Sequence, residues 1–514
     1  MHSLISAPSL VSAVLLGSSV VNAGFHLDFK RRPHAKQLAR RDGETVSVPG
    51  TQQLGYTPEG GYFANITIGT PPQPLEIQLD TGSSETFIQA TTACEGRDSD
   101  NPCVGGVFNT SASSSYRVTA PGALIQAYGT GSQNATGDYA LDTVTLGDAV
   151  LPGTSLAVAT KSNINDAVMG LGTDALLGGS SNITKATILD SLKTNGAISS
   201  KIFSIWLDPD YTQGGSFYFG GVDDSKYDIN QGLVTLDQIR NPFSGLLDYY
   251  LVPLLEMSIS GNGESDPFLP PADNTTSPNF APALPVHVDS GNSGGDIPES
   301  VFNLIVSLTG AKQVPSFPGG YGVPCSYAQN QSLQDVKLSW TLGDPRDTSK
   351  HIQFSVPLSS LIIPIYHQGT ANPYTVTAGD VASILGEPAP ANPSEEVQVC
   401  GVAVNPVDPS PGNFVTLGDV FMRAMFSVFD PEHNRVSFGK PLARQVSWTG
   451  IGGSGAVGAN GTATGTSNSS TTGTGGPPAA TFAGAGVMGA VPGSFWTSTL
   501  VTVAVVGFAN MLSC

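Results

Sequence analysis

Two short segments of this chain each place an aspartate at the end of a strand-like run. Residues 77–84 read IQLDTGSS, and residues 286–293, half a chain later, read VHVDSGNS. In each segment a glycine two positions after the aspartate permits a sharp turn. Two carboxylates can supply the base and the acid that amide hydrolysis needs. One such triplet is weak evidence, but two in similar settings indicate a duplicated lobe with Asp80 and Asp289 as candidate catalytic residues.

The motifs around these turns resemble those of the pepsin-like aspartic proteases. GYFANITIGTPPQ (61–73) matches the family's entry strand, and YGTG (128–131) resembles its flap. The runs at 166–172 and 414–421 resemble the segments that thread beside the catalytic turns, and the resemblance spans residues 56–440. It implies an all-β fold with a few short helices: the bilobal pepsin-like acid protease fold, with its active site in the cleft between the lobes.

The resemblance also implies roles for individual residues. Asp80 and Asp289 would share one proton and activate water between them at acid pH, because two adjacent carboxylates do not both ionise readily. The residues expected at the flap and against the substrate are Tyr128, Gly129, Thr130, Gly82 and Gly291. Those expected to support the pair are Thr81, Ser83, Ser290 and Asn292.

Four positions depart from the family pattern. Asn292 stands where a Thr or Ser is usual, and Phe87 stands where many members have a Trp that bonds to the flap tyrosine. Gln78 and His287 replace apolar residues, and each points to the same side as the following aspartate because strand side chains alternate. Either these polar groups alter side-chain preference beside the scissile bond, or neighbouring backbone satisfies them.

Two other functions compete with the aspartic protease. Residues 291–295 read GNSGG and resemble the nucleophile turn of trypsin-like serine proteases, but no histidine lies in that family's own motif. The Asp80 turn would also remain unexplained. The second alternative is a catalytically weak or inactive pepsin-like shell that serves as a cell-surface binding or wall glycoprotein, and Asn292 motivates it.

Composition supports a secreted β protein. Of 514 residues only 12% are charged, while there are 61 Gly and 38 Pro. The formal charge of −19 argues against nucleic acid as a partner and fits work at low pH. Protein or peptide substrates are the expected partners, and we expect a monomer.

The cysteines and glycosylation sequons also indicate the secretory route. An oxidising compartment would favour the pairs Cys94–Cys103 and Cys325–Cys400, with Cys514 left over, although sequence alone does not fix the connectivity. No Cys/His cluster has metal-ligand spacing, so neither a metal nor another cofactor is expected. The candidate N-glycosylation sites are Asn65, Asn109, Asn134, Asn182, Asn274, Asn330, Asn460 and Asn468.

The order of segments completes the prediction. Residues 1–23 read as a signal peptide. Residues 24–41 read as a basic pro-segment, which either covers the acidic active-site cleft or serves only as a processing spacer. The lobes are placed at 56–240 and 241–440, a Gly/Ser/Thr-rich stalk at 441–482, and a GPI-anchor signal at 483–514, with a membrane helix as its alternative. This order resembles the fungal GPI-anchored, yapsin-type proteases. It implies the outer face of the cell membrane, with the cell wall or the medium as other destinations.

Overall fold

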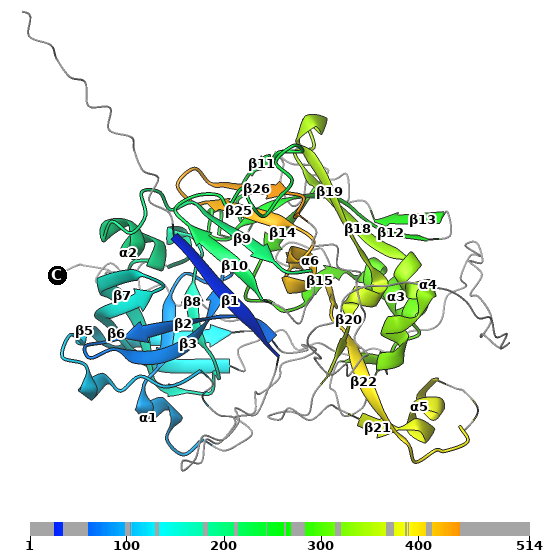
Figure 1. The fold of residues 1–514 in the computed structure, drawn as a ribbon, viewed down its shortest axis with the longest axis horizontal. Helices are drawn as coiled ribbons and strands as arrows, with labels where there is room; N and C mark the ends of the chain where they lie inside the picture. The colour runs from blue at the N-terminus through cyan, green and yellow to red at the C-terminus, as the bar shows by residue number, and fades with distance from the viewer. Residues whose placement is uncertain are drawn as a thin grey trace, which may run out of the picture. The chain divides into compact units, whose positions relative to one another are not determined.

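The computed structural model describes residues 25–33 and 60–442, apart from gaps at 98–102, 104, 129–132, 178–182, 184, 210–213, 243, 262–263, 269–282, 314–319, 366–374, 386–387, 389 and 408–413. The predicted signal peptide, anchor signal and nearly all of the stalk lie outside the described residues. The chain divides into two compact units, 1–454 and 455–514, and all described residues belong to the first. Strands dominate and helices are short, which confirms the predicted fold class (Figure 1).

The larger sheet draws mainly on the first half of the chain. Its strands follow the order β11-β26-β25-β9-β10-β1-β2-β3-β8-β4-β7-β6-β5. Their bounds are β1 Phe25–Pro33, β2 Gly60–Ile68, β3 Gln73–Asp80, β4 Thr86–Gln89, β5 Arg117–Tyr128, β6 Gln133–Leu146, β7 Ala149–Ser162, β8 Ala167–Gly170, β9 Phe203–Leu207, β10 Gly215–Phe219, β11 Val234–Asp237, β25 Phe426–Asp430 and β26 Arg435–Gly439.

Strand β1 lies between β10 and β2 and runs antiparallel to both (Figure 1). Phe25 pairs with Phe219, and Lys30 pairs with Phe63. The strand belongs to the predicted pro-segment, for which the sequence analysis predicted no strand. Backbone pairing therefore ties the described part of this segment into the sheet.

Two smaller sheets are formed by the second half of the chain. The eight-stranded sheet contains β12 Leu251–Gly261, β13 Glu264–Phe268, β14 Leu284–Val288, β15 Gly295–Pro298, β18 Lys337–Gly343, β19 His351–Pro357, β23 Asn405–Val407 and β24 Val415–Leu417. The five-stranded sheet contains β16 Lys312–Gln313, β17 Tyr321–Pro324, β20 Ile362–Pro364, β21 Thr375–Thr377 and β22 Glu396–Val402.

Short helices connect these strands. The α-helices are α1 Thr91–Cys94, α2 Ile188–Thr194, α3 Glu299–Thr309, α4 Gln331–Asp335, α5 Ala378–Leu385 and α6 Asp419–Met422. The 3₁₀ helices are η1 Thr110–Ala112, η2 Asp174–Leu177, η3 Cys325–Gln329, η4 Thr348–Lys350 and η5 Leu358–Leu361. Within the described part of the chain, no helix is both long enough and apolar enough to span a membrane.

The pairing around each aspartate occurs twice. In the first half β3 runs parallel to β8, β8 is antiparallel to β4, and β4 is parallel to β7. In the second half β14, β24, β15 and β23 repeat these three relations in the same order. This repetition agrees with the duplicated lobe that the two turn motifs predict.

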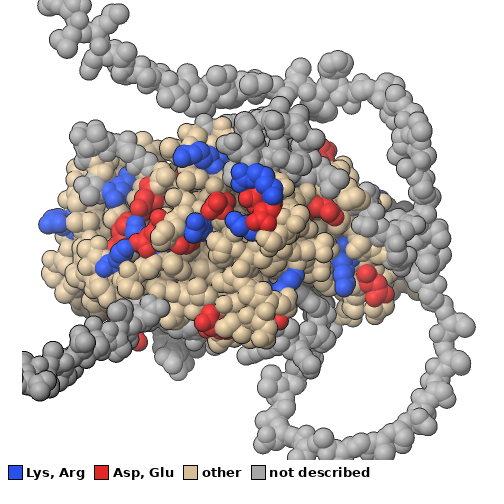
Figure 2. Space-filling view, turned by 90° about the horizontal axis from the view of Figure 1, so that it is seen from above, with Lys and Arg blue, Asp and Glu red and all other residues tan. Residues whose placement is uncertain are grey.

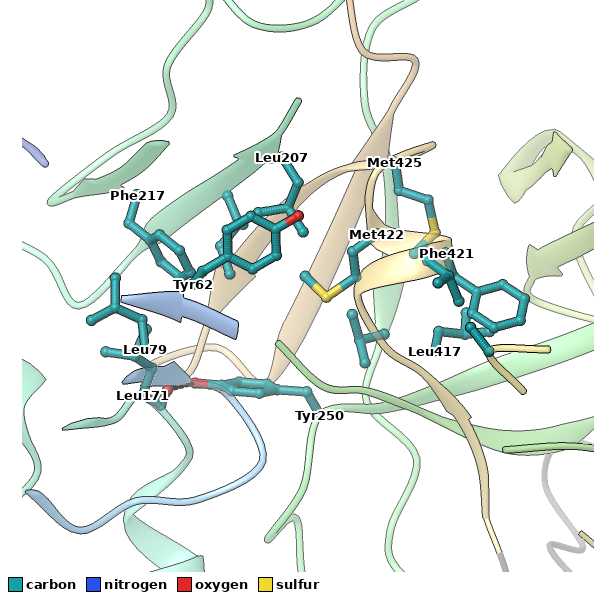
Figure 3. Packing of buried hydrophobic residues seen from close by; sticks show 14 of the residues in the cluster. Tyr62, Leu79, Leu171, Leu207, Phe217, Tyr250, Leu417, Phe421, Met422 and Met425 are labelled. Carbon is teal, nitrogen blue, oxygen red and sulfur yellow. Dashed lines mark hydrogen bonds between the residues drawn. The ribbon is translucent and has the colours of Figure 1, made fainter. Parts of the chain in front are cut away.

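Behind the turns, one apolar cluster contains residues from both halves of the sequence. Figure 3 shows Leu79 and Leu171, from the range predicted for the N-terminal lobe, near Tyr250, from the range predicted for the C-terminal lobe. The Tyr250 hydroxyl donates a hydrogen bond to the Leu171 carbonyl at 2.9 Å, and all three residues are buried. Further members drawn are Tyr62, Leu207, Phe217, Leu417, Phe421, Met422 and Met425. The turns therefore rest on a common apolar core.

The surface carries few charges. On the face in Figure 2, cationic and anionic side chains lie intermixed among uncharged residues. Disulfides join Cys94 to Cys103 and Cys325 to Cys400. Among the sequon residues, Asn65, Asn109, Asn134 and Asn330 are exposed, and the other four lie outside the described residues.

Candidate active site

Equivalent strands deliver the two predicted catalytic aspartates. Asp80 is the last residue of β3, and Asp289 directly follows β14. The Leu171 N–H donates to the Asp80 carbonyl at 2.7 Å, and the Asp289 N–H donates to the Leu417 carbonyl at 3.1 Å. The two apolar runs assigned by resemblance therefore do lie beside the turns.

Four hydrogen bonds lock the two turns together through Thr81 and Ser290. The Thr81 hydroxyl donates to the Val288 carbonyl and accepts from the Ser290 N–H, both at 2.9 Å. In return the Ser290 hydroxyl donates to the Leu79 carbonyl at 2.9 Å and accepts from the Thr81 N–H at 3.1 Å. Both side chains are fully buried, so water does not compete for these hydrogen bonds.

Each carboxylate is held by its own turn. Asp80 accepts from the Gly82 N–H at 2.7 Å and from the Ser83 hydroxyl at 2.5 Å. Asp289 accepts from the Gly291 N–H at 2.8 Å. Each carboxylate also lies against the opposite turn, because a Cβ on Gly82 would lie 2.6 Å from Asp289 Oδ1. A Cβ on Gly291 would likewise lie 2.5 Å from the Asp80 carboxyl carbon. Only glycine fits at either position.

Burial changes the protonation of the pair. Burial, and after it the neighbouring Asp289, raise the pKa of Asp80 to about 7, while the Ser83 and Gly82 hydrogen bonds oppose the change. Burial also raises the pKa of Asp289, with the Gly291 N–H acting against it. Both raised pKa values agree with the general rule that two carboxyl groups this close to one another resist double ionisation.

The second turn lacks the hydroxyl donor of the first. Ser83 has its counterpart in Asn292, whose side-chain oxygen instead accepts from the Gly294 N–H at 3.0 Å. Among the described residues, the side-chain amide of Asn292 makes no hydrogen bond to either carboxylate, whereas its backbone N–H helps to lower the pKa of Asp289. Asp289 therefore lacks the hydroxyl donor that Ser83 supplies to Asp80.

The two polar residues that precede the aspartates have different surroundings. The Gln78 amide donates to the Gly291 carbonyl at 3.1 Å, so neighbouring backbone satisfies this side chain. His287 is buried with its Nδ1 3.9 Å from Asp289 Oδ2, and its Nε2 has no hydrogen-bond partner among the described residues. The backbone explanation therefore holds for Gln78 alone.

The predicted flap is only partly described. Strands β5 and β6 pair up to Tyr128 opposite Gln133. Gly129 and Thr130 lie outside the described residues, as does the Tyr128 side chain. Phe87 is fully buried in an apolar cluster with Leu124.

The serine-protease alternative gains no support from the site. His287 is the histidine closest in sequence to Ser293. Within the described ranges its Nε2 has no hydrogen-bond partner, and its Nδ1 faces Asp289. No Ser–His pair is formed in the GNSGG segment, as far as the described residues extend.

Sequence reasoning missed three residues of the site. Tyr249 packs its ring edge-on to His287, with ring centroids 5.0 Å apart. Asp296 lies on β15 opposite Thr416, and Thr416 in turn pairs with His287 across β24. Asp248 is buried and accepts from Asn241 at 3.1 Å. Of these three residues, only Asp296 could have been found from the sequence, because it lies on the strand that follows the second turn.

Known proteins are similar to this chain over most of its length. The family model described as "Eukaryotic aspartyl protease" matches residues 61–441. The chain is 29% identical to the "Probable aspartic-type endopeptidase opsB" of Aspergillus oryzae over 80% of this chain and 74% of the relative. It is 26% identical to the "Acid protease" of Saccharomycopsis fibuligera, over 73% and 79%. With the "Gastricsin" of Callithrix jacchus the identity is 27%, over 74% and 81%. The chain therefore belongs to the eukaryotic aspartyl protease family.

Proposed function

We propose that this protein is an aspartic endopeptidase that hydrolyses peptide bonds at acid pH, with Asp80 and Asp289 as its catalytic pair. One observation carries the proposal: the two carboxylates lie close together. The Asp289 carboxylate lies against Gly82 of the first turn, and the Asp80 carboxylate lies against Gly291 of the second. The family membership and the names of the relatives agree with it.

The chemistry follows from one proton shared by two carboxyl groups. The ionised member takes a proton from a water molecule as that water attacks the peptide carbonyl carbon. The protonated member gives its proton to the carbonyl oxygen, which produces a tetrahedral diol. The carboxyl that gained the water proton then protonates the nitrogen, the C–N bond breaks, and the other carboxylate recovers its proton from the diol.

Replacing either aspartate tests this proposal. Asp80→Asn and Asp289→Asn should each lower kcat/KM for an acid-pH peptide substrate by about 10²–10⁴-fold, because each removes the group that accepts or donates a proton. Asp335→Asn is the matched control, since Asp335 is an exposed acid on α4, and should keep wild-type activity. Wild-type activity in either dyad variant, or inhibition by a serine-directed organophosphonate instead of a statine peptide, would contradict the mechanism.

The binding-protein alternative rests on a specific observation. Asp289 lacks the hydroxyl donor that Asp80 receives from Ser83, because Asn292 bonds to its own turn. A protein of this kind would bind a statine peptide at acid pH yet cleave no peptide library at any pH. Cleavage that the statine peptide inhibits would exclude it.

We also propose that the enzyme is secreted, N-glycosylated and held on the outer cell surface by a GPI anchor, as in the yapsin-type proteases. Support comes from the apolar segment in residues 1–23, the tail at 483–514, two disulfides, and exposed asparagines at four sequons. Phospholipase C specific for phosphatidylinositol should release the protein from cells, and truncation after residue 482 should send it to the medium. Retention after both treatments would refute the anchor.

A further inference from the structure

His287 is an ionisable side chain that the proposed mechanism does not use. It lies on β14, two residues before Asp289, and faces the same side of the sheet. Its Nδ1 is 3.9 Å from Asp289 Oδ2, which is ion-pair distance for a charged ring and too long for a hydrogen bond. The side chain is 9% exposed, so water screens this contact poorly.

The charge of the surroundings favours a protonated ring. Besides Asp289, the charged or titratable groups that face His287 are Asp80 from the first turn, Asp296 from β15, Asp248 before β12, and the Tyr249 phenol. Burial favours the neutral ring and lowers the pKa of His287 to about 4, while Asp80, Asp296 and Asp248 act in the opposite direction. The ring therefore gains its proton within the acid range.

The His287 ring lies beside Asp289, the carboxylate that has no hydroxyl donor in its own turn. Ser83 donates to Asp80 at 2.5 Å, whereas Asn292 leaves the equivalent place on Asp289 without a side-chain donor. A purely structural histidine of this depth would have both nitrogens hydrogen-bonded, yet Nε2 has no partner among the described residues. Hydrogen bonding among the described residues therefore gives no reason for an imidazole here.

We propose that His287 is a positioning residue for Asp289: its protonated ring supplies, at acid pH, the favourable interaction with the carboxylate that a hydroxyl at position 292 would otherwise supply. This inference rests on the proposed function. The ring holds the pair in its singly ionised, active form at the acid end of the pH range. Above that range the ring is neutral and contributes little.

The two sides of the pH profile separate this role from a structural one. The acid limb of kcat/KM reports the first ionisation of the pair, which a neighbouring positive charge makes easier. The basic limb reports the second ionisation, at a pH where the ring is neutral. Loss of the ring should therefore move the acid limb alone.

The experiment measures the kcat/KM profile of the full chain on a fluorogenic peptide. His287→Leu should move the acid limb upward by about one pH unit and leave the basic limb in place. Adding Asn292→Thr to that variant should return the acid limb toward the wild-type position. His433→Gln is the control, because His433 also contacts an acid, with Nδ1 2.8 Å from Asp430 Oδ2, but at the surface.

Three results would overturn the inference: an unmoved acid limb in His287→Leu, an equal shift of both limbs, or a uniform loss of activity at every pH. If His287→Leu fails to fold, His287→Gln gives the same test, since it keeps a polar side chain without a charge. A wild-type protein without acid proteolysis would instead refute the proposed function, and this inference with it, so the two failures are distinguishable.

Discussion

Thr81 and Ser290 show how single hydroxyls can hold two halves of a site together. Each side chain donates to a carbonyl and accepts from an N–H of the opposite turn. Because both are fully buried, removal of a hydroxyl takes a hydrogen-bond partner from a carbonyl and an N–H of the opposite turn, and bulk water cannot replace it. These residues therefore matter to stability as well as to the position of the carboxylates.

Thr81→Val tests this at the residue scale. Valine keeps the shape of threonine but leaves the Val288 carbonyl and the Ser290 N–H unpaired, so we expect a loss of about 2–5 kcal/mol in the free energy of unfolding. Urea denaturation measures it. Thr81→Ser keeps the hydroxyl and should lose less than about 1.5 kcal/mol. Equal losses in the two variants would show that the methyl group, and not the hydrogen bonds, stabilises the turns.

Buried His287 makes a second prediction at this scale, independent of catalysis. Its folded pKa of about 4 lies below the ordinary value of 6.5, so the unfolded chain binds this proton more tightly. His287 therefore destabilises the fold progressively as pH falls from about 6.5 to about 4. His287→Leu should gain stability over wild type in that interval, by an amount that grows toward acid pH. A constant difference between the two unfolding curves would contradict this.

At the scale of elements, much of the site follows from strands that the sequence makes evident. The strand-like runs before Asp80 and Asp289 predicted the strands that carry both acids. The family resemblance placed residues 166–172 and 414–421, which contain β8 and β24, beside the two turns. What the sequence could not predict is cross-strand register. That register brings Asp296 opposite Thr416 and Thr416 opposite His287, and it depends on pairing between distant segments. The sequence likewise did not predict that the Asn292 side chain accepts a hydrogen bond from the Gly294 N–H and does not donate to Asp289.

Strand β1 raises a prediction at the same scale. It fills the place between β10 and β2, so deleting residues 24–41 would leave two strand edges unpaired. We expect that deletion, made behind an intact signal segment, to lower the thermal midpoint by about 5 °C. The control carries Arg40→Ala and Arg41→Ala. These remove the basic pair that the sequence offers as a processing site, so the segment stays attached and the protein should melt as the wild type does. An unchanged midpoint after deletion would show that the sheet does not need β1.

For the whole molecule, carboxyl groups with raised and with lowered pKa values act on stability in opposite directions. The Arg346 hydrogen bond lowers the pKa of half-buried Asp344 to about 2, so Asp344 stabilises the fold above its unfolded pKa and loses this effect as pH falls. Burial raises the pKa of Asp80 to about 7, so Asp80 is stabilising below about pH 4 and this contribution is lost as pH rises to about 7. Greatest stability is expected between these ranges, at about pH 4–5.

Asp80→Asn tests how the ionisation of Asp80 changes the free energy of unfolding as pH rises toward neutrality. The amide cannot ionise, so the variant escapes the cost of charging a buried carboxyl, and its stability relative to wild type should rise between about pH 4 and 7. At pH 7 the gain should be about 2–4 kcal/mol, measured by urea denaturation across that range. Asp335→Asn, at an exposed position, should follow the wild-type curve throughout. Parallel curves for Asp80→Asn and wild type would mean that the pair ionises in the fold as easily as in the unfolded chain, and the shared proton on which the mechanism depends would be lost.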